Sequence, residues 1–480
     1  MYINANSYKH LENDSKMIQA AIDEASLSGK SVLIPKYNER TGRDIWNIAE
    51  TLYLHSESVI LLQNCHLRLA DGAVCHMFSN SNAKKPIALT EEGTQRNITI
   101  QGIGKALLDG GIHNGIYEDN GISRKVVKPS EHKAYENCMC YFQKVENLKI
   151  DNITVKDHRY WAIALFTTTY SRISNIHFIS SSNVPNQDGI DLLKGCHDCI
   201  IENITGYTGD NMVALLATAD DIYGDVVNNV REGDIYNITV RNIMAHSVGG
   251  CSIVRLLCHD GYKIYNIRID NLIETSPWSE KDSNVAPNPD LNITTDSEGN
   301  IIRRHLTVGE EGYRCESAII IGESYWYKNF KAQSGDMYGI SVSNVMTHAR
   351  YAIFLNNTVL DSSFENIRLF GNGYMAAYFG EGEMERLRFS NISYDKNARP
   401  HKDDEHIYID WNKTRSDGLS CVYFNTTKVS DIEFDGIHCA EGISSVFGGN
   451  GNGTVTCSRI IKNGVPTLSC AKGITIDEKK

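Results

Sequence analysis

Two acidic clusters within residues 183–216 have the composition and spacing for acid/base chemistry. Asp188 lies in the sequence Asn-Gln-Asp-Gly and is followed by Asp191, and Asp210 lies in Gly-Asp-Asn, 22 residues after Asp188. Two carboxyl groups held close together perturb each other, so that one tends to keep its proton while the other stays ionised. Such a pair can protonate a glycosidic oxygen and activate water. The spacing is equally compatible with aspartates that cap turns, because Asp, Asn and Gly are common turn residues.

A recurring motif predicts the elements that position these acids. It reads hydrophobic, any residue, hydrophobic, any residue, Asn or Gly, hydrophobic, and most neighbouring copies lie 22 to 39 residues apart. A repeat of this length is typical of a solenoid, and the alternation is typical of a strand. The sequence therefore predicts an all-β fold, a right-handed parallel β-helix, with an ordinary β-sandwich and chance spacing as the alternative. The Asn or Gly of the motif stands at Gly102, Asn152, Asn175, Asn203, Asn242, Asn271, Asn344, Asn366, Asn391 and Gly436.

A parallel β-helix gives this repeat two structural consequences. The recurrent Asn should form a ladder at one turn, where its side-chain amide satisfies backbone groups and where a left-handed backbone is tolerated. A separation of 22 residues is close to one coil. Asp188 and Asp210 should therefore lie on neighbouring coils of one face, with their backbones about 4.8 Å apart.

The N-terminal residues predict a helix that caps the solenoid. Asn13 and its two successors offer helix caps, apolar residues recur at helical spacing from Met17 to Ala25, and Gly29 ends the helix. A strand follows at Ser31–Pro35. The helix should cover the core of the first coil, which would otherwise be exposed. We expect a single β-helix domain over residues 1–480.

Residues 275–313 break the rhythm of the repeat and are rich in Pro, Ser, Asn and charge. Such an insertion is expected to be a loop on the binding face, with a surface hairpin that has no role as the alternative. As a wall at one end of a groove, it would favour action on chain ends. Product profiling on long and short chains tests this hypothesis, and random mid-chain cleavage would exclude it.

Composition limits the partners and the location of the protein. The formal net charge of −12 argues against nucleic acid and anionic membrane surfaces as partners, and no apolar run approaches the roughly 18 residues that a membrane span needs. The first ten residues show no signal-peptide pattern, so we expect a cytoplasmic protein unless the chain has been processed. The odd number of cysteines, 13, favours buried reduced thiols. Cys196 and Cys199 have the spacing of metal ligands, but no second pair lies at a zinc-ribbon distance, so neither a metal nor a cofactor is expected.

Several segments resemble glycoside hydrolase family 28, the polygalacturonase family. The order and spacing of the segments agree with the family, and the resemblance covers most of the first 260 residues. The segments are Lys16–Pro35 (helix, then strand), Ile98–Gly110 (ITIQGIGKALLDG), Tyr160–Ile163 (beside the family's Ser-Pro-x-Trp), Asn186–Gly189 (NQDG for Asn-Thr-Asp-Gly) and Gly209–Asn211 (GDN for Gly-Asp-Asp).

The resemblance implies the roles of the acids. Asp210 would be the general acid, and Asp188 would help to activate the water in an inverting reaction that forms no covalent intermediate. Asn211 stands where the family has a second Asp that shares this water, and Gly249 stands where the family has a histidine. The family's Arg-Ile-Lys motif has no equivalent, since the aligned text Ser317–Gly322 contains no basic residue.

These departures favour a changed substrate over a dead enzyme. The resemblance implies an oligo- or polysaccharide substrate with α-linked sugars, for which pectic, galacturonic-acid-containing chains are the family default. A β-helix polysaccharide lyase and a non-catalytic carbohydrate-binding solenoid are the alternatives. Candidate substrate-binding residues, including possible substitutes for the missing groups, are Asp191, Arg255, His246, Trp278, Tyr325, Trp326 and Tyr351, and spare acids that could replace the pair are Glu310, Glu311, Glu316 and Glu323.

Overall fold

The chain folds into two compact units of parallel β-strands. Unit 1 comprises residues 1–213, 219–233 and 289–306, and unit 2 comprises residues 214–218, 234–288 and 307–480. A single domain over residues 1–480 stays a prediction. The computed structural model describes residues 1–111, 134–180, 186–218, 233–248, 251–259, 261–276, 293–295, 301–303, 315–322, 332–371, 373–395, 420–440, 443–465 and 467–479.

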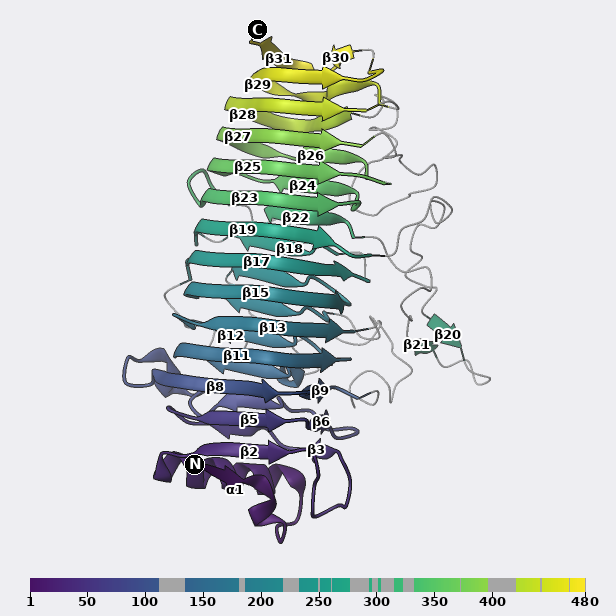
Figure 1. Ribbon diagram of the computed structural model, residues 1–480. Coiled ribbons are helices and arrows are strands. Elements are labelled where there is room, and N and C mark those ends of the chain that lie inside the picture. The colour runs from purple at the N-terminus through teal and green to yellow at the C-terminus, as the bar shows by residue number, and fades with distance from the viewer. Residues whose placement is uncertain are drawn as a thin grey trace. The chain divides into compact units, whose positions relative to one another are not determined.

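Unit 1 is built of coils in which each strand pairs in parallel with the matching strand of the next coil, as the stacked arrows of β11, β13 and β15 show in Figure 1. The predicted right-handed parallel β-helix is thereby confirmed. The strands are β1 (Tyr2–Asn4), β2 (Ser31–Pro35), β3 (Trp46–Ile48), β4 (Leu52–Leu54), β5 (Val59–Gln63), β6 (His66–Leu69), β7 (Phe78–Asn80), β8 (Gln95–Ile103), β9 (Leu107–Asp109), β10 (Cys140–Gln143), β11 (Val145–Lys156), β12 (Ile163–Phe166), β13 (Arg172–Ile179), β14 (Ile190–Leu193) and β15 (His197–Thr208), and the 3₁₀ turns are Ala5–Tyr8, Pro86–Leu89 and Ala134–Asn137.

The core of unit 1 consists of columns of aliphatic side chains. Along β11, buried residues alternate with more exposed ones, as the sequence pattern predicts. Ile150 of β11 lies in register with Ile173 of β13, which lies in register with Ile201 of β15, and all three are buried. Each such side chain contributes about 1.5–3 kcal/mol of hydrophobic stabilisation, so the repeat of apolar positions maintains the register of the coils.

The recurrent Asn forms the predicted ladder. Asn152, Asn175 and Asn203 have φ values of 58°, 55° and 57°, and the Asn203 side-chain amide donates to Asn175 Oδ1 at 3.0 Å. Gly102, at the start of the ladder, accepts from Asn152 through its backbone carbonyl at 2.9 Å. Asn tolerates this left-handed backbone because its short polar side chain bonds locally, which explains why it recurs at this bend.

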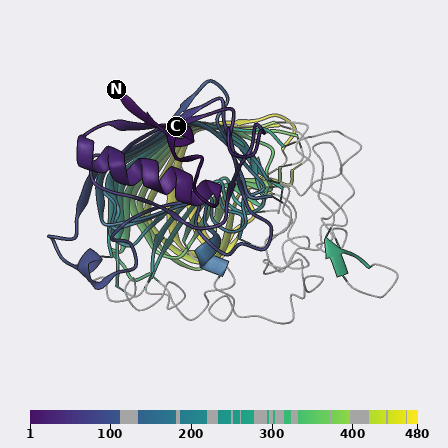
Figure 2. The same cartoon turned by 90° about the horizontal axis from the view of Figure 1, so that it is seen from below.

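The helix α1 (Asp14–Ser28) begins and ends as predicted and lies across the end of the first coils, as Figure 2 shows. The Asn13 side chain accepts from the Lys16 amide at 2.8 Å, and Gly29 ends the helix with φ 63°. The apolar residues that the spacing selected, Met17, Ile18, Ala21, Ile22 and Ala25, are all buried. The helix thus covers apolar side chains of the first coil.

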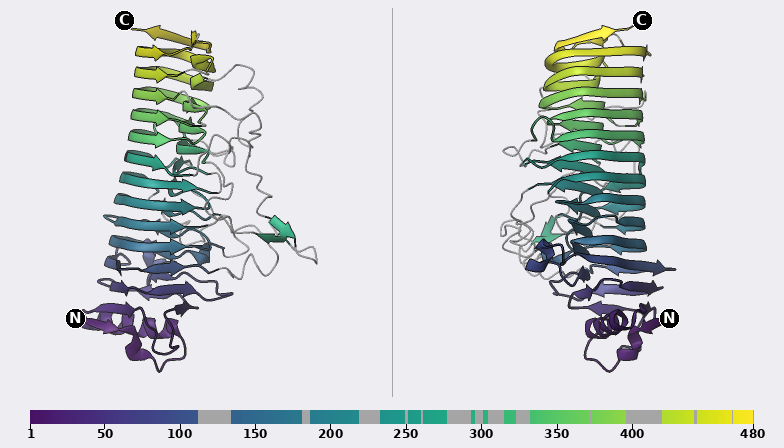
Figure 3. Two further views of the ribbon diagram at one scale, coloured as in Figure 1. Left: turned by 45° about the vertical axis from the view of Figure 1, so that its right-hand side comes forward. Right: turned by 90° about the vertical axis from the view of Figure 1, so that its left-hand side faces the viewer.

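Unit 2 repeats the same architecture, and its parallel strands are seen from two sides in Figure 3. The Asn271 side-chain amide donates to Asn242 at 2.9 Å, and Asn366 and Asn391 continue a ladder from Asn344 at 3.1 Å for each bond. The strands are β16 (Val213–Ala217, which starts at the last residue of the first range of unit 1), β17 (Ile235–Ser247), β18 (Val254–Cys258), β19 (Ile264–Glu274), β22 (Ser317–Gly322), β23 (Met337–Thr347), β24 (Tyr351–Asn356), β25 (Val359–Leu369), β26 (Met375–Phe379), β27 (Gly382–Tyr394), β28 (Ser420–Cys439), β29 (Ser445–Lys462), β30 (Thr467–Ser469) and β31 (Lys472–Glu478).

Most of the insertion at residues 275–313 lies outside the described residues. Its described part includes β20 (Ile293–Thr295) and β21 (Ile301–Arg303), which pair antiparallel as a two-stranded sheet. The described part of the insertion therefore forms an antiparallel strand pair, and the predicted place of the insertion near a binding face stays a prediction. Among the described helices, none is long and apolar enough to span a membrane.

Candidate active site

The two acids of the predicted pair belong to unit 1, and each lies shortly before a short strand. Asp188 lies two residues before β14, and Asp210 lies between β15 and β16. The Asp210 amide donates to the Gln187 carbonyl at 3.0 Å, and the Gly189 amide donates to the Asn211 carbonyl at 2.9 Å. These two bonds set Asp188 and Asp210 side by side on adjacent coils, as their spacing in the sequence predicts.

The Asn211 side chain joins the two carboxylates. Its Nδ2 donates to Asp188 Oδ1 at 2.9 Å and to Asp210 Oδ1 at 2.8 Å, and the Asn211 backbone amide donates to Asp210 Oδ1 at 2.9 Å. Because one nitrogen binds both oxygens, those oxygens are at most about 6 Å apart. Asp188 is only 4% exposed, whereas Asp210 is half-buried. Asp210 is therefore the more accessible of the two acids.

A buried histidine holds the loop that carries Asp188. His158 Nδ1 shares a hydrogen bond of 2.8 Å with the Ser180 hydroxyl, and the His158 carbonyl accepts from Gln187 Nε2 at 2.6 Å. Burial lowers the pKa of His158 to about 4, although the backbone of Gln187 and Asp188 acts in the opposite direction. His158 is therefore neutral at pH 7. Its carbonyl holds the Gln187 side chain, and the Gln187 carbonyl in turn accepts a hydrogen bond from the Asp210 amide.

The depressed pKa of His158 predicts a loss of stability in acid. Because the unfolded chain takes up a proton near pH 6.5 and the folded chain does so only near pH 4, stability is lost as the pH falls through this window. We expect His158 to lower the free energy of unfolding by about 2 kcal/mol between pH 7 and pH 5. Urea titrations should show a smaller change in the free energy of unfolding between pH 7 and pH 5 for His158→Asn than for the wild type. The same change in both proteins would contradict this role of His158.

The segment that contains the acid pair is recognisable at the family level. Residues 58–229 match the family model of Glycosyl hydrolases family 28. The match includes Asp188, Asp210 and Asn211, and it confirms the family 28 resemblance. The comparison with curated proteins finds no match.

Solved structures that resemble the chain are distant in sequence. The tailspike protein of E. coli bacteriophage HK620, as a double mutant in complex with a pentasaccharide, is 12% identical and has a TM-score of 0.53, with 98% of this chain and 78% of that chain covered. The family 28 exopolygalacturonase of Yersinia enterocolitica is 14% identical, with a TM-score of 0.48 and coverage of 100% and 79%. The exopolygalacturonase of Thermotoga maritima is 12% identical, with a TM-score of 0.41 and coverage of 99% and 92%. The tailspike likeness shows the fold alone.

Three further candidates lie away from solvent or in unit 2. Asp191 is fully buried on β14 beside Ala164, and burial together with the Asp191 carboxylate raises the pKa of the Cys138 thiol. His246 belongs to unit 2, where it is 6% exposed and shares a hydrogen bond of 3.1 Å with Thr275. Burial lowers the pKa of His246 to about 4. Arg255 is half-buried on β18, also in unit 2. The binding roles of Asp191, His246 and Arg255 stay predictions.

Of the aromatic candidates for substrate binding, the structure describes only Tyr351. Tyr351 is a sequence candidate for substrate binding, but it is 1% exposed and packs edge-on against Phe354 at 5.2 Å, so its ring is part of a buried cluster. The sequence could not reveal this, because Tyr351 begins a strand that is buried on both faces. The remaining aromatic candidates and the other unplaced positions lie outside the described residues; they are Trp278, Tyr325, Trp326, Gly249, Glu310, Glu311 and Glu323.

All 13 cysteines are free thiols, and all but Cys75, Cys251 and Cys470 are buried. Cys196 and Cys199 are buried, and their thiols donate to the carbonyls of Leu165 at 3.2 Å and His197 at 3.2 Å. Within the described ranges, no group of three His, Cys, Asp or Glu residues could hold a metal ion.

A short internal repeat marks two histidines that are not among the candidates from the sequence. The text DHRYWAI starts at residue 157, and the text THARYAI starts at residue 347. His158 in the first copy binds the Ser180 hydroxyl at 2.8 Å, and His348 in the second binds the Ser276 hydroxyl at 2.8 Å. The two copies share His, Arg-Tyr and Ala-Ile, and this similarity in the sequence could have identified both histidines. Each copy thus anchors the turn before a short strand through a histidine–serine pair.

Proposed function

We propose that the protein is a glycoside hydrolase that cleaves α-linked sugars in uronic-acid-containing oligosaccharides. The observation that carries this proposal is the Asn211 amide, which binds Asp188 and Asp210 at 2.9 and 2.8 Å inside the segment that matches family 28. Acids of opposite role held at one place are what glycosidic cleavage requires.

The different burial of the two acids supports different roles. Asp210 is half-buried and can approach a glycosidic oxygen, which suits the general acid. Asp188 is almost fully buried and its Oδ1 is bound by Asn211, which suits a group that orients a water molecule rather than one that attacks the sugar. Asn211 stands in place of a second acid and would donate hydrogen bonds to both carboxylates. Asp188 alone would then activate the attacking water molecule.

An acidic oligosaccharide needs local positive charge, because the chain as a whole carries a formal charge of −12. The tailspike that shares the fold was solved with a pentasaccharide, and a saccharide is the partner that we propose here. Arg255 is the half-buried cation that we propose for substrate binding.

The proposal is tested by incubating the protein with de-esterified galacturonan chains and with neutral α-linked oligosaccharides. Mass spectrometry should show products that have gained one water molecule. Unsaturated products that absorb in the ultraviolet would indicate a lyase instead, and binding without any product would indicate a non-catalytic solenoid.

A further inference from the structure

A second set of left-handed residues lies five residues before each Asn or Gly of the repeated motif. All members have φ values between 48° and 64°. Asn, Asp and Gly accept such a backbone at low cost, and most members are of these types. The residues are Asn97, Asn147, Tyr170, Asp198, Asn237, Asn266, Gly339, Asp361, Arg386 and Asp431.

Tyr170 and Arg386 are the two members with a large side chain. Arg386 still bonds to the preceding coil, because its guanidinium donates to the Asp361 carboxylate at 2.5 and 2.9 Å. Tyr170 makes no such bond among the described residues. Asn147 of the preceding coil donates to Asn97 at 2.7 Å, but no described residue donates to Asn147 Oδ1 in turn. The ladder of side-chain amides therefore stops at Tyr170.

The backbone of Tyr170 is strained, and its hydrogen bonds prevent relaxation. A bulky side chain is sterically disfavoured in the left-handed region, where Tyr170 has a φ of 52°. The turn is bonded to both adjacent coils: the Asn147 amide donates to the Thr169 carbonyl at 2.9 Å, and the Tyr170 amide donates to the His197 carbonyl at 3.2 Å. Strain that the surrounding structure maintains is typical of functional positions.

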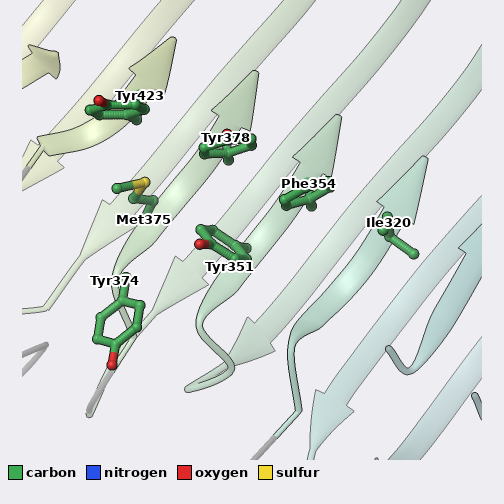
Figure 4. Close-up of a cluster of buried hydrophobic side chains, with 7 residues drawn as sticks. All are labelled: Ile320, Tyr351, Phe354, Tyr374, Met375, Tyr378 and Tyr423. Carbon is green, nitrogen blue, oxygen red and sulfur yellow. The ribbon is translucent and has the colours of Figure 1, made fainter. Parts of the chain in front are cut away.

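The Tyr170 ring is exposed and has a defined orientation. It is 58% exposed, and His197 of the next coil meets it edge to face, with 5.8 Å between ring centroids and 82° between ring planes. One such contact covers at most one face of the Tyr170 ring. In unit 2, by contrast, Phe354 and Tyr378 stack at 4.8 Å and are both buried (Figure 4). Tyr170 thus presents an aromatic surface to solvent instead of filling a core.

The charges near this tyrosine favour an uncharged ligand. Glu146, directly before Asn147 on the preceding coil, is paired with Arg96 at 3.1 Å. Lys144 of the same segment is paired with Glu91 at 2.7 Å. These pairs leave no excess of positive charge for an acidic sugar, so a uronic acid would gain little from them.

We propose that Tyr170 is the stacking platform of a second saccharide-binding site, which takes a neutral pyranose ring. The C–H groups on one side of a sugar ring pack against an aromatic face. A sugar hydroxyl can donate to Asn147 Oδ1, which the adjoining coil presents in register with Tyr170. Because the turn is fixed on both sides, little conformational freedom is lost when a sugar binds.

The site lies apart from the acid pair within unit 1. The Asp188 carbonyl accepts from the Ala162 amide directly before β12, whereas Tyr170 lies four residues after the end of β12. The whole short strand therefore separates the two places. The inference goes beyond the proposed function, because it assigns the binding of an uncharged sugar and requires no cleavage.

The test is a titration of the full chain with maltohexaose, a neutral chain of α-linked glucose, followed by saturation-transfer NMR. The C–H protons of the sugar should receive saturation from the wild type and from Tyr170→Phe, which keeps the ring. Tyr170→Asn should weaken binding at least about 10-fold. Tyr53→Asn removes a 45% exposed tyrosine from β4 of the same unit and should bind as the wild type does.

Thermal unfolding distinguishes a binding tyrosine from a structural one. Asn fits the left-handed backbone, and its amide can donate to Asn147 Oδ1 as in the rest of the ladder. Tyr170→Asn should therefore raise the midpoint of thermal unfolding by about 1–2 °C, whereas Tyr53→Asn should not raise it. Differential scanning calorimetry measures both shifts.

Three results would overturn the site. They are an absence of maltohexaose binding to the wild type, equal binding to the wild type and Tyr170→Asn, and a lower midpoint for Tyr170→Asn, which would make Tyr170 a packing residue. None of these results depends on turnover, so the proposed hydrolysis stands or falls separately.

Discussion

Replacing Asp210 by Asn is expected to lower kcat about 1,000-fold on substrates with a sugar leaving group, because an amide cannot deliver a proton to the glycosidic oxygen. The shape of the side chain is kept, and its oxygen can still accept from the Asn211 amides that now bind at 2.8 and 2.9 Å. Substrate binding should therefore be preserved. Steady-state kinetics and calorimetry on the same variant measure both effects.

The leaving group separates a general acid from a residue that only maintains the site. A dinitrophenolate departs without protonation, so the Asp210→Asn variant should lose much less activity on a dinitrophenyl glycoside than on an oligosaccharide. Asp198→Asn is a matched control, because Asp198 is a half-exposed acid of the same unit with a left-handed backbone that Asn accepts. Equal losses on both substrates would exclude the acid role.

Replacing Asn211 by Ala is expected to lower kcat about 100-fold. The change removes the only side-chain group that the described residues show bound to both Asp188 and Asp210, and hydrogen bonds to charged groups contribute about 1.5–3 kcal/mol each. The two carboxylates would then face each other without a donor between them. Steady-state kinetics on the oligosaccharide substrate measure the loss.

Replacing a second amide distinguishes this effect from general damage to the fold. Asn463→Ala removes an exposed side chain that is hydrogen-bonded to His438 at 2.8 Å, and it should leave kcat unchanged. If Asn211→Ala retained wild-type kinetics, the bridge between the acids would have no part in the reaction.

The sequence predicted the coils because the fold repeats its local rules. Each bend needs a residue that accepts a left-handed backbone, so Asn recurs at Asn152, Asn175 and Asn203 with φ values between 55° and 58°. One partner was missed: Asn97 and Asn147 form a second ladder, with 2.7 Å between their side chains. This ladder lies five residues before the first one on the same long strands, β8 and β11, outside the six-residue motif.

The juxtaposition of Asp188 and Asp210 was predictable for the same reason, since a separation of one coil implies neighbouring positions. The bridge by Asn211 was not, because its substitution for an acid reads only as a loss in the sequence. Which residues of the short strands are exposed could not be predicted from the sequence either. All four residues of β14 are buried, so no alternation distinguishes Asp191 from its neighbours.

Contacts between distant coils escaped the sequence altogether. Glu274 and Thr347 are 73 residues apart and meet at 2.5 Å only because β19 pairs with β23 across the insertion. The length of an insertion gives no information about which strands pair on either side of it. The contact between Glu274 and Thr347 therefore could not be predicted from the sequence.

The anomeric configuration of the first product tests the central claim most directly. Inverting glycosidases typically hold their carboxyl groups about 6.5–9.5 Å apart to admit water, and retaining ones about 5–5.5 Å apart. The span of at most about 6 Å that Asn211 sets lies nearer the retaining value, so the product anomer decides whether water or Asp188 attacks the sugar. Proton NMR during cleavage of an α-linked substrate should show the β-anomer first, because Asp188 activates water and Asp210 protonates the leaving oxygen. The α-anomer as first product would contradict this account and would make Asp188 the nucleophile.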